Sequence, residues 1–282
     1  MKDWPRISVI TPSYQQALFL QETLRSVLTQ DYPNLEYIVI DGGSTDGSVE
    51  IIKKHENQLS FWVSEKDRGA ADAIRKGFER ATGAIMAYLN SDDVYLPGTL
   101  KAVAEVFIQD PSCDLVFGDS YWIDTESRVL AERRQTPFSA KRYLYGGADI
   151  PQPSTFWKRE MYLKAGGINP EFHFAFDMDL FCRFISLSAR FKHVKRFLSS
   201  ARIHSEAKSS TLHDTYDKEL AKIRSAHLPY PVRSLYGRFT RNLGRIQRTC
   251  WYLIQGDLFW LLNRIPDRLR ADEPVGPRTR WK

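Results

Sequence analysis

Apolar residues in the first part of the chain follow two alternating spacings. Short runs rich in β-branched and aromatic residues predict buried strands, and apolar residues three and four positions apart predict amphipathic helices. The predicted strands are Arg6–Thr11, which ends at Pro12, Tyr37–Ile40, Phe61–Val63, Ile85–Leu89 and Asp114–Phe117, with a last strand at Lys192–Leu198. The helical stripes are Leu20, Leu24, Val27 and Leu28; Val49, Ile51 and Ile52; Ile74, Phe78 and Ala81; and, beginning near Pro97, Leu100, Val103, Ala104 and Phe107. Because right-handed crossovers join parallel strands, this alternation predicts an α/β fold with a mostly parallel twisted sheet.

Polar clusters stand where four of these strands end. They are Thr11–Tyr14, Asp41–Ser44, Glu65–Arg68 and Asn90–Asp93. In such sheets ligands bind beyond the carboxyl ends of the strands. The sequence therefore predicts a binding site along that edge.

The composition is that of a globular protein, with 43% hydrophobic and 26% charged residues. Cys113, Cys182 and Cys250 lie far apart, which argues against a disulfide scaffold or a cysteine zinc site and suits a reducing compartment. The N-terminus lacks the basic start and apolar stretch of a signal peptide, and no apolar run is long enough to span a bilayer. We therefore expect a cytoplasmic protein that contacts, at most, the cytoplasmic face of a membrane.

The net charge of +6 is unevenly distributed. Residues 213–282 contain 14 Lys and Arg against 7 Asp and Glu, or +7, which leaves 26 against 27, or −1, for residues 1–212. We therefore divide the chain into an α/β domain at 1–212 and a basic, helical C-terminal extension at 213–282. The α/β domain needs no nucleic acid or other polyanion as a partner.

Two interpretations of the extension stay open. Arginines alternate with apolar residues and are followed by an aromatic segment: Arg233, Arg238, Arg241, Arg245 and Arg248, then Trp251, Tyr252, Leu253, Phe259, Trp260 and Leu261. In one interpretation the helices pack on the α/β domain and leave the arginines in solvent. In the other they lie on an anionic membrane with the aromatic segment inserted.

Carboxylates at strand ends are the first candidates for chemistry. Asp41 can accept hydrogen bonds from a nucleobase or a ribose, and the alternative is a simple turn. Asp46 is predicted to cap the next helix. Asp92 and Asp93 repel each other unless a cation or capped amides neutralise them. This pair favours a Mg²⁺ or Mn²⁺ site completed by substrate phosphates over a helix cap at Asp93.

Three further residues are candidates with open alternatives. Asp177, in the segment FAFDMDLFCRF, is either a general base, because apolar surroundings raise the pKa of a carboxylate, or a helix cap; we prefer it to Asp179. His204 taken alone is more often structural than a ligand. Arg68 either holds a pyrophosphate or pairs with Asp67.

Together these segments resemble the inverting glycosyltransferase family 2, which has a single GT-A-type nucleotide-binding domain. The resemblance runs from Ile7 to about Ser210 and is most specific in SVITPSYQQ and IVIDGGSTDGS. It implies that Thr11, Pro12 and Tyr14 border the nucleoside and that Asp41 contacts the base. In SEKDRGAADAIRKGF, Asp67 and Arg68 match a second nucleotide-binding segment.

The same resemblance assigns the catalytic centre. In LNSDD, Asp93 would hold Mg²⁺ or Mn²⁺ and Asp92 would face the ribose, while His204 matches a histidine that joins the metal or the diphosphate. Asp177 occupies the position of the base in the acceptor-side stretch. Two positions depart from the family pattern: Arg75 stands where Asn is common, and Phe176 stands where Glu often precedes the base.

We therefore expect an inverting, metal-dependent transferase that moves a sugar from a nucleotide-sugar donor to a saccharide or lipid-linked saccharide, in cell-surface polysaccharide or glycolipid assembly. The Gln-x-x-Arg-Trp signature of processive relatives is absent, which predicts one sugar per encounter. One alternative is a sugar-phosphate nucleotidyltransferase, but TPSYQQA lacks the glycines of a phosphate loop. The other is a non-catalytic scaffold, which has no use for Asp41, Asp93 and Asp177.

Overall fold

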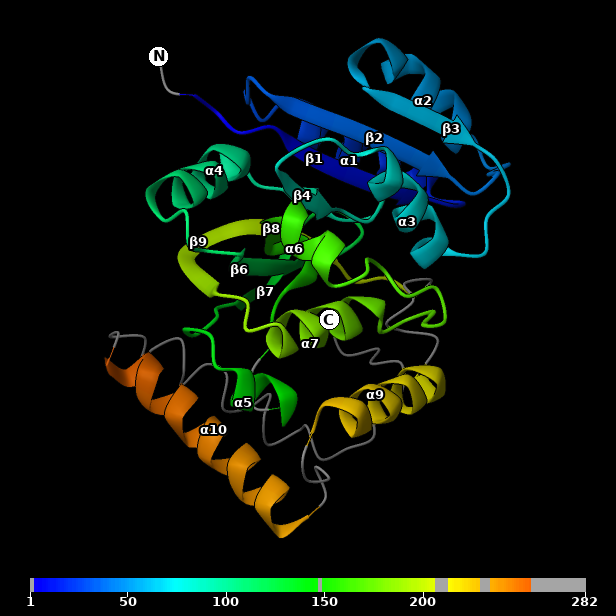
Figure 1. Ribbon diagram of the computed structural model, residues 1–282. Coiled ribbons are helices and arrows are strands. Elements are labelled where there is room, and N and C mark those ends of the chain that lie inside the picture. The colour runs from blue at the N-terminus through cyan, green and yellow to red at the C-terminus, as the bar shows by residue number, and fades with distance from the viewer. Residues whose placement is uncertain (1–2, 147–148, 206–212, 229–233, 255–282) are drawn as a thin grey trace.

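The computed structural model describes residues 3–146, 149–205, 213–228 and 234–254 of the 282-residue chain (Figure 1). The strands are β1 (Ile7–Ser13), β2 (Leu35–Asp41), β3 (Phe61–Ser64), β4 (Ile85–Tyr88), β5 (Val94–Tyr95), β6 (Leu115–Ile123), β7 (Val129–Arg133), β8 (Thr155–Lys158) and β9 (Phe191–Arg202). The helices are α1 (Ala17–Leu28), α2 (Ser48–His55), α3 (Ala70–Arg80), α4 (Thr99–Gln109), α5 (Ala140–Leu144), α6 (Arg159–Lys164), α7 (Phe176–Ser186), α9 (His213–His227) and α10 (Leu235–Ile254). Two short 3₁₀ helices are η1 (Glu56–Gln58) and η2 (Gln152–Ser154).

Within the described residues, nine strands form one sheet in the order β3-β2-β1-β4-β8-β6-β9-β5, with β7 paired to β6. The strands β3, β2, β1 and β4 are parallel, as predicted. β8 lies antiparallel between β4 and β6, so β6 and its parallel neighbour β9 run in the same direction as β4. β5 and β7 run opposite to their neighbours. The α/β fold with a mostly parallel sheet is therefore confirmed.

Helices cover both faces of the sheet because side chains alternate along each strand. Ile7 and Val9 of β1 join one core cluster with residues of α1, α2 and α4, whereas Ile10 joins the other with residues of α3, α6 and α7. Helix α3 lies very close to β1, since a Cβ on Gly77 would fall 2.4 Å from Cγ2 of Ile10.

Two predicted boundaries were wrong by a few residues. β1 continues through Pro12 to Ser13, although we expected it to end at the proline. The nitrogen of Pro12 faces the side on which β4 pairs with β1, and β4 ends at Tyr88, opposite Ile10, so no ladder bond is lost there. Helix α4 begins at Thr99, after Gly98 in the left-handed region, and not at Pro97.

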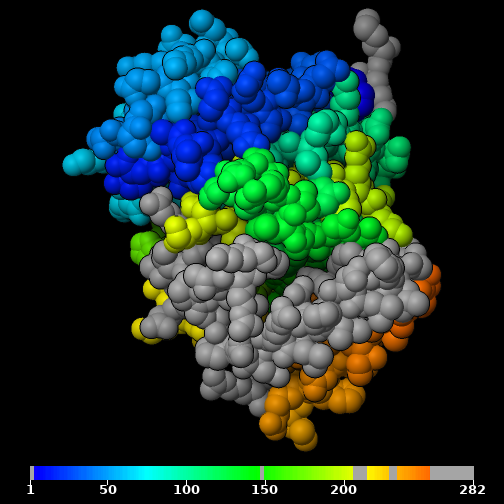
Figure 2. Space-filling view, turned by 180° about the vertical axis from the view of Figure 1, so that it is seen from behind, coloured from blue at the N-terminus to red at the C-terminus, as the bar shows by residue number. Residues whose placement is uncertain are grey.

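The helices after residue 212 pack against the rest of the chain. α9 contacts α7, and its Ile223 is buried in the core. α10 contacts α5 and lies at the end of the molecule opposite α2 and β3 (Figures 1 and 2). Among the residues described, no helix is sufficiently long and apolar to cross a bilayer.

Helix α10 turns mainly small residues inward and most of its large apolar residues outward. Gly237, Thr240 and Gly244 are buried. The exposed apolar side chains are Leu235, Tyr236, Phe239, Leu243, Ile246, Leu253 and Ile254. At 100° per residue they fall within one arc of about 100°, which we call the α10 stripe.

One residue of the aromatic segment, Tyr252, does not lie as the membrane interpretation requires. Tyr252, which would insert in the membrane interpretation, is 1% exposed, and its hydroxyl donates to the Arg134 carbonyl at 2.6 Å. At Tyr252 the structure therefore follows the packing interpretation, because a buried phenol needs a partner for its hydroxyl and finds one in the protein. Phe259, Trp260 and Leu261 lie outside the described residues.

Candidate active site

The carboxyl ends of the parallel strands bring three of the predicted polar clusters together. Ser13, Asp41 and Ser64 lie in register across β1, β2 and β3. The Asp41 carboxylate is fully buried and accepts hydrogen bonds from the amides of Gly43 and Ser44 and from the hydroxyls of Ser44 and Ser64, at 2.6–3.1 Å. Asp41 therefore shapes its own turn, and a ligand that contacts it must share or replace these bonds.

Asp46 was predicted to cap the following helix; it stands one residue before the N-cap Gly47, and its side chain binds the first residue of α2 and ties two helices together. One of its oxygens accepts from the Ala17 amide at the start of α1, and the other from the Ser48 amide and hydroxyl at the start of α2. Burial tends to raise the pKa of Asp46, but these hydrogen bonds prevail and lower it. The turn after β2 is thereby fixed to the loop after β1.

Of the residues predicted to border the nucleoside, Tyr14 lies at the surface, and Thr11 and Pro12 lie beneath it. Tyr14 is 61% exposed, and a Cβ on Gly42 would lie 3.2 Å from its ring and 2.8 Å from Oδ2 of Asp67. Glycine at position 42 thus lets both Tyr14 and Asp67 approach the backbone where a larger residue would place its Cβ. Thr11 and Pro12 are buried, and the Thr11 hydroxyl is 2.9 Å from the hydroxyl of Tyr37.

Arg68 pairs with Asp72 and not with Asp67, the partner considered from the sequence. Its guanidinium is 3.3 Å from Oδ1 of Asp72, while the Arg68 side chain remains 75% exposed. Burial tends to raise the pKa of Asp72, but bonds from Arg75 and Arg68 outweigh it and hold the pKa below its usual value. Asp72 was not among the residues expected from the sequence, although its place one helical turn after Arg68 was a signal.

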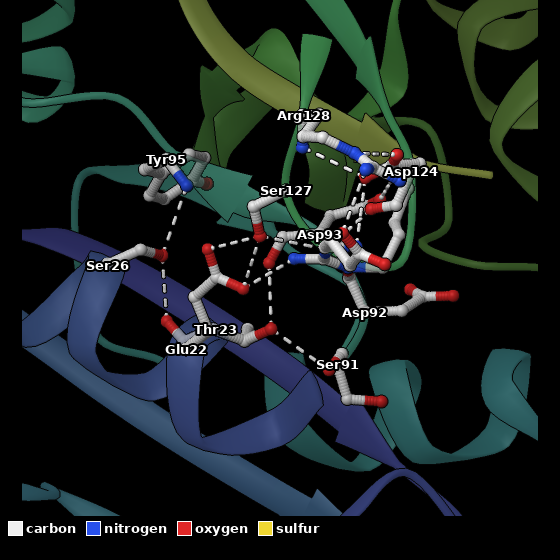
Figure 3. A network of polar contacts seen from close by, with 12 residues as sticks. Glu22, Thr23, Ser26, Ser91, Asp92, Asp93, Tyr95, Asp124, Ser127 and Arg128 are labelled. Atoms are coloured by element: carbon white, nitrogen blue, oxygen red, sulfur yellow. Dashed lines mark hydrogen bonds and ion pairs between the residues drawn. The ribbon is translucent and has the colours of Figure 1, made fainter. Parts of the chain in front are cut away.

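The Asp92–Asp93 loop follows β4 and lies between α1 and the Asp124–Arg128 turn (Figure 3). Asp93 is buried and does not cap α4; it accepts from the Arg202 amide at 3.0 Å and from the Asn90 side chain at 3.3 Å. Burial, and next the charge of Asp92, raise the pKa of Asp93 well above its usual value. Oδ2 of Asp92 is 3.0 Å from Nε2 of His204. The structure thus brings His204 to the acidic motif, in contact with Asp92.

Arg202, the last residue of β9, was missed by the sequence analysis. Its side chain is fully buried, and its Nε donates to the Asp92 carbonyl at 2.9 Å. Its terminal nitrogens reach the Asp124 carbonyl at 2.8 Å, the Ser127 hydroxyl at 3.0 Å and Glu22 at 2.7 Å. A charged residue at the end of the strand FKHVKRFLSSAR, two positions before His204, was the available signal.

Asp177 is the second residue of α7 and lies half-buried among aromatic residues. Its Oδ1 accepts from the Met178 amide at 2.7 Å. Burial raises its pKa to about 6, against this hydrogen bond, and the charge of Asp149 adds to the shift. Asp179 instead forms an ion pair with Arg183 at 2.7 Å, which gives it a structural role on the same helix. Phe176 is buried, with its ring centroid 5.9 Å from that of Tyr88.

Tyr88 connects the two groups of carboxylates. Burial raises its pKa well above the usual value, and the charges of Asp177 and Asp93 raise it further, so its hydroxyl lies within electrostatic reach of both. Gln152 donates to the Tyr88 carbonyl at 2.8 Å and accepts from Asn90 at 3.4 Å. The acidic loop and Asp177 therefore border one region of the molecule.

The donor set at the acidic loop suits a hard divalent cation. Asp93 offers carboxylate oxygens and His204 an imidazole, and burial, and next the charge of Asp92, destabilise ionised Asp93 unless a cation is near. Among the residues described, no three His, Cys, Asp or Glu side chains converge as a complete metal cage. Mg²⁺ is usually held by one or two carboxylates together with substrate phosphates, so these residues fit such an ion.

The chain matches a known family and known relatives. The model of the family described as Glycosyl transferase family 2 matches residues 8–176. An uncharacterized glycosyltransferase of Mycobacterium tuberculosis is 31% identical over 185 residues, which cover 65% of this chain and 70% of the relative. Chondroitin synthase of Escherichia coli is 23% identical over 261 residues, covering 92% of this chain but 38% of the synthase.

Solved structures share the fold. TarS of S. aureus, residues 1–349 in complex with UDP-GlcNAc, aligns with a TM-score of 0.63 and 18% identity, over 83% of this chain and 69% of that chain. Mannosyltransferase PcManGT from Pyrobaculum calidifontis, in complex with GDP-Man and Mn²⁺, aligns with a TM-score of 0.60 and 18% identity, over 95% of this chain and 86% of that chain. At these identities the likeness shows the fold alone.

Proposed function

This chain belongs to glycosyl transferase family 2 and is a glycosyltransferase, and from this premise we propose that it transfers one sugar per encounter, with inversion, from a nucleotide-sugar donor to a hydroxyl group. The proposed acceptor is a saccharide or lipid-linked saccharide in cell-surface polysaccharide or glycolipid assembly at the cytoplasmic face of a membrane. Chondroitin synthase, a relative by sequence, and the nucleotide-sugar complexes of similar fold support this class of reaction.

The observation that carries the proposal is the environment of Asp177. With a pKa of about 6, its carboxylate is mostly ionised at neutral pH and yet basic enough to accept a proton. The acceptor oxygen forms a bond to the anomeric carbon while the bond from that carbon to the diphosphate oxygen breaks. The hydroxyl proton passes to Asp177, and the nucleoside diphosphate leaves from the opposite face, which inverts the configuration.

The donor side uses the strand ends. Tyr14, Asp41 and Asp67 surround the place proposed for the nucleoside, with Thr11 and Pro12 behind them and Arg68 exposed beside it. We assign Asp93 and His204 to a Mg²⁺ or Mn²⁺ ion and Asp92 to the ribose. When bound, such an ion supplies positive charge against the departing diphosphate.

Donor binding tests this proposal directly. The ligands tested are UDP, GDP, UDP-GlcNAc and GDP-mannose. We expect at least one of them to raise the melting temperature of the protein more with Mn²⁺ than without it, because a ligand that binds the folded state stabilises it. NMR of the transferred or hydrolysed sugar should show inversion at the anomeric carbon. Retention would exclude direct displacement, and absence of nucleotide binding would favour the non-catalytic alternative.

The α10 stripe supports an anionic membrane as a second partner. Tyr236 at one edge of the stripe packs edge-on to Tyr145, with ring centroids 5.9 Å apart, and the other apolar side chains of the stripe are exposed. Arg238 and Arg245 are exposed along one flank. An interfacial helix needs an apolar face that enters the headgroup region and basic residues that meet anionic lipids. Each such arginine contributes only about 1 kcal/mol, so the apolar stripe must also insert.

Vesicle binding tests the membrane proposal. The fraction of protein that sediments with phosphatidylglycerol vesicles should fall when salt is added. It should also fall in the double variant Phe239→Ser plus Ile246→Ser, and by a smaller amount in the double variant Arg238→Gln plus Arg245→Gln. The matched control is Lys53→Gln plus Lys54→Gln, which removes two exposed charges at the opposite end of the molecule. If a second copy of the chain covers the stripe, the protein should instead form concentration-dependent dimers and not bind vesicles. That result would refute the proposed membrane contact.

A further inference from the structure

Helix α9 lies outside the segment that matches the family and outside the predicted α/β domain, yet it packs beside the candidate base. The family match ends at residue 176, and α9 spans His213–His227. Its Ile223 is buried in the same core cluster as residues of α7. Its Tyr216 ring lies edge-on to Phe174 with centroids 5.0 Å apart. Figure 1 shows α9 alongside α7.

The strongest link between the two helices is Glu219. Its carboxylate accepts hydrogen bonds from three consecutive backbone amides, those of His173 at 2.8 Å, Phe174 at 3.0 Å and Ala175 at 2.8 Å. Ala175 is the N-cap of α7 and has no side-chain cap of its own. A carboxylate at this end of α7 is also favoured by the helix dipole.

We propose that Glu219 is a positioning residue for Asp177, so that α9 completes the active site; this rests on the proposed function, in which Asp177 is the base. Ala175 and Asp177 are two residues apart. The Asp177 carboxylate accepts a hydrogen bond from the amide of the adjacent Met178, so its position follows that of the backbone at the start of α7. The three bonds to Glu219 fix the backbone that enters α7. They thereby set where the Asp177 oxygens stand relative to an acceptor hydroxyl.

Helix α9 also contributes electrostatically, through Tyr216. Burial raises the pKa of Tyr216, and the charge of Asp177 raises it further. Tyr88 and Tyr143 are affected by Asp177 in the same way. Tyr216 from α9, like these two tyrosines of the α/β domain, is thus harder to ionise because of the charge of Asp177.

The experiment compares the full-length wild-type protein with Glu219→Gln and with Asp217→Asn, a control that removes an exposed carboxylate from the same helix. The reaction measured is release of UDP or GDP from UDP-GlcNAc or GDP-mannose, whichever the wild type uses. A displacement of about 1 Å can cost about 100-fold in rate, so we expect Glu219→Gln to lower kcat by up to that factor. The dissociation constant of the nucleoside diphosphate should not change, and Asp217→Asn should match wild type in both.

Hydrogen exchange provides the readout that a general loss of stability would not give. In Glu219→Gln the amides of residues 173–175 should exchange faster while those of β1 and β2 stay protected. Unchanged kcat with faster exchange at 173–175 would overturn the proposal. If Glu219→Gln does not fold, Glu219→Asp, which retracts the carboxylate by one methylene, takes its place. It should likewise lower kcat without changing the dissociation constant of the nucleoside diphosphate, and a parallel loss of nucleotide binding would overturn the proposal.

Asp177→Asn, measured beside these variants, separates this inference from the proposed function. If Asp177→Asn retains kcat, the assignment of the base fails, and the role of Glu219 fails with it. If Asp177→Asn is inactive while Glu219→Gln is fully active, only the role of Glu219 is refuted.

Discussion

The donor edge and the acceptor side of the site hold their carboxylates in different ways. Asp41 accepts four hydrogen bonds from its own turn and from Ser64, and Asp93 accepts from the Arg202 amide and from Asn90. Asp177 accepts one bond, from the amide of the next residue, in half-buried aromatic surroundings. The donor edge is fixed by many local contacts, whereas the position of Asp177 depends on α7 and on what holds α7.

This difference fits the role that we propose for each side. A group that binds a donor benefits from a rigid position, and hydrogen bonds supply it. A general base benefits from a raised pKa, which many hydrogen bonds to the carboxylate would lower. The sparse contacts of Asp177 are therefore part of its proposed chemistry, and the variants below test whether the two sides separate in function.

The largest effect is expected from Asp177→Asn. Removing a positioned general base typically costs roughly 10²–10⁴ in rate, so turnover should fall by that range while the affinity for nucleoside diphosphate stays near that of wild type. The matched control is Asp179→Asn on the same helix, which loses the ion pair with Arg183. It should lower the melting temperature and leave turnover close to that of wild type. Equal losses in rate and donor affinity for Asp177→Asn would point to a structural role.

Asp93→Asn should reverse this pattern on the donor side. The variant should keep the fold, because it removes a buried carboxyl group whose ionisation is opposed by Asp92, but lose metal-dependent donor binding and most transfer. The loss should exceed the about 10- to 100-fold typical of residues that only support metal ligands. Calorimetry with UDP or GDP, with and without Mn²⁺, measures it, and wild-type affinity in the presence of Mn²⁺ would refute the metal assignment.

Arg202→Gln should give the intermediate effect. Arg202 holds the Asp92 carbonyl and joins it to α1 and the Asp124–Arg128 turn, so its loss should weaken Mn²⁺-dependent nucleotide binding about 10- to 100-fold. Arg128→Gln is the control, since Arg128 is an exposed arginine of the same turn that pairs with Asp124 and Glu126. Equal behaviour of the two variants would show that Arg202 serves the fold alone.

The fold was more predictable than the contacts of the site. The parallel strands carry long apolar runs and end in polar clusters, so β1 to β4 and their shared edge could be derived from spacing. β5, β7 and β8 could not, because short strands such as Val94–Tyr95 form only when a distant strand, here β9, is already in place. Arg202 and Glu219 were missed for the same reason: their partners are about 110 and 45 residues away in the chain, and sequence periodicity reports only local neighbours.

The smallest expected effect is a pH-dependent change in stability at Asp177. Burial raises its pKa from 3.8 to about 6, so the unfolded chain ionises first as the pH rises and the folded state loses stability between these values. Asp177→Asn removes this loss, and its melting temperature should exceed that of wild type above pH 6 and match it near pH 4. Wild-type turnover should rise through the same range, because the base must be ionised. Asp179→Asn should instead be less stable than wild type at neutral pH, where its ion pair with Arg183 is formed. A melting temperature of Asp177→Asn that stays below wild type at every pH would show that Asp177 stabilises the fold, against the contrast between the two sides.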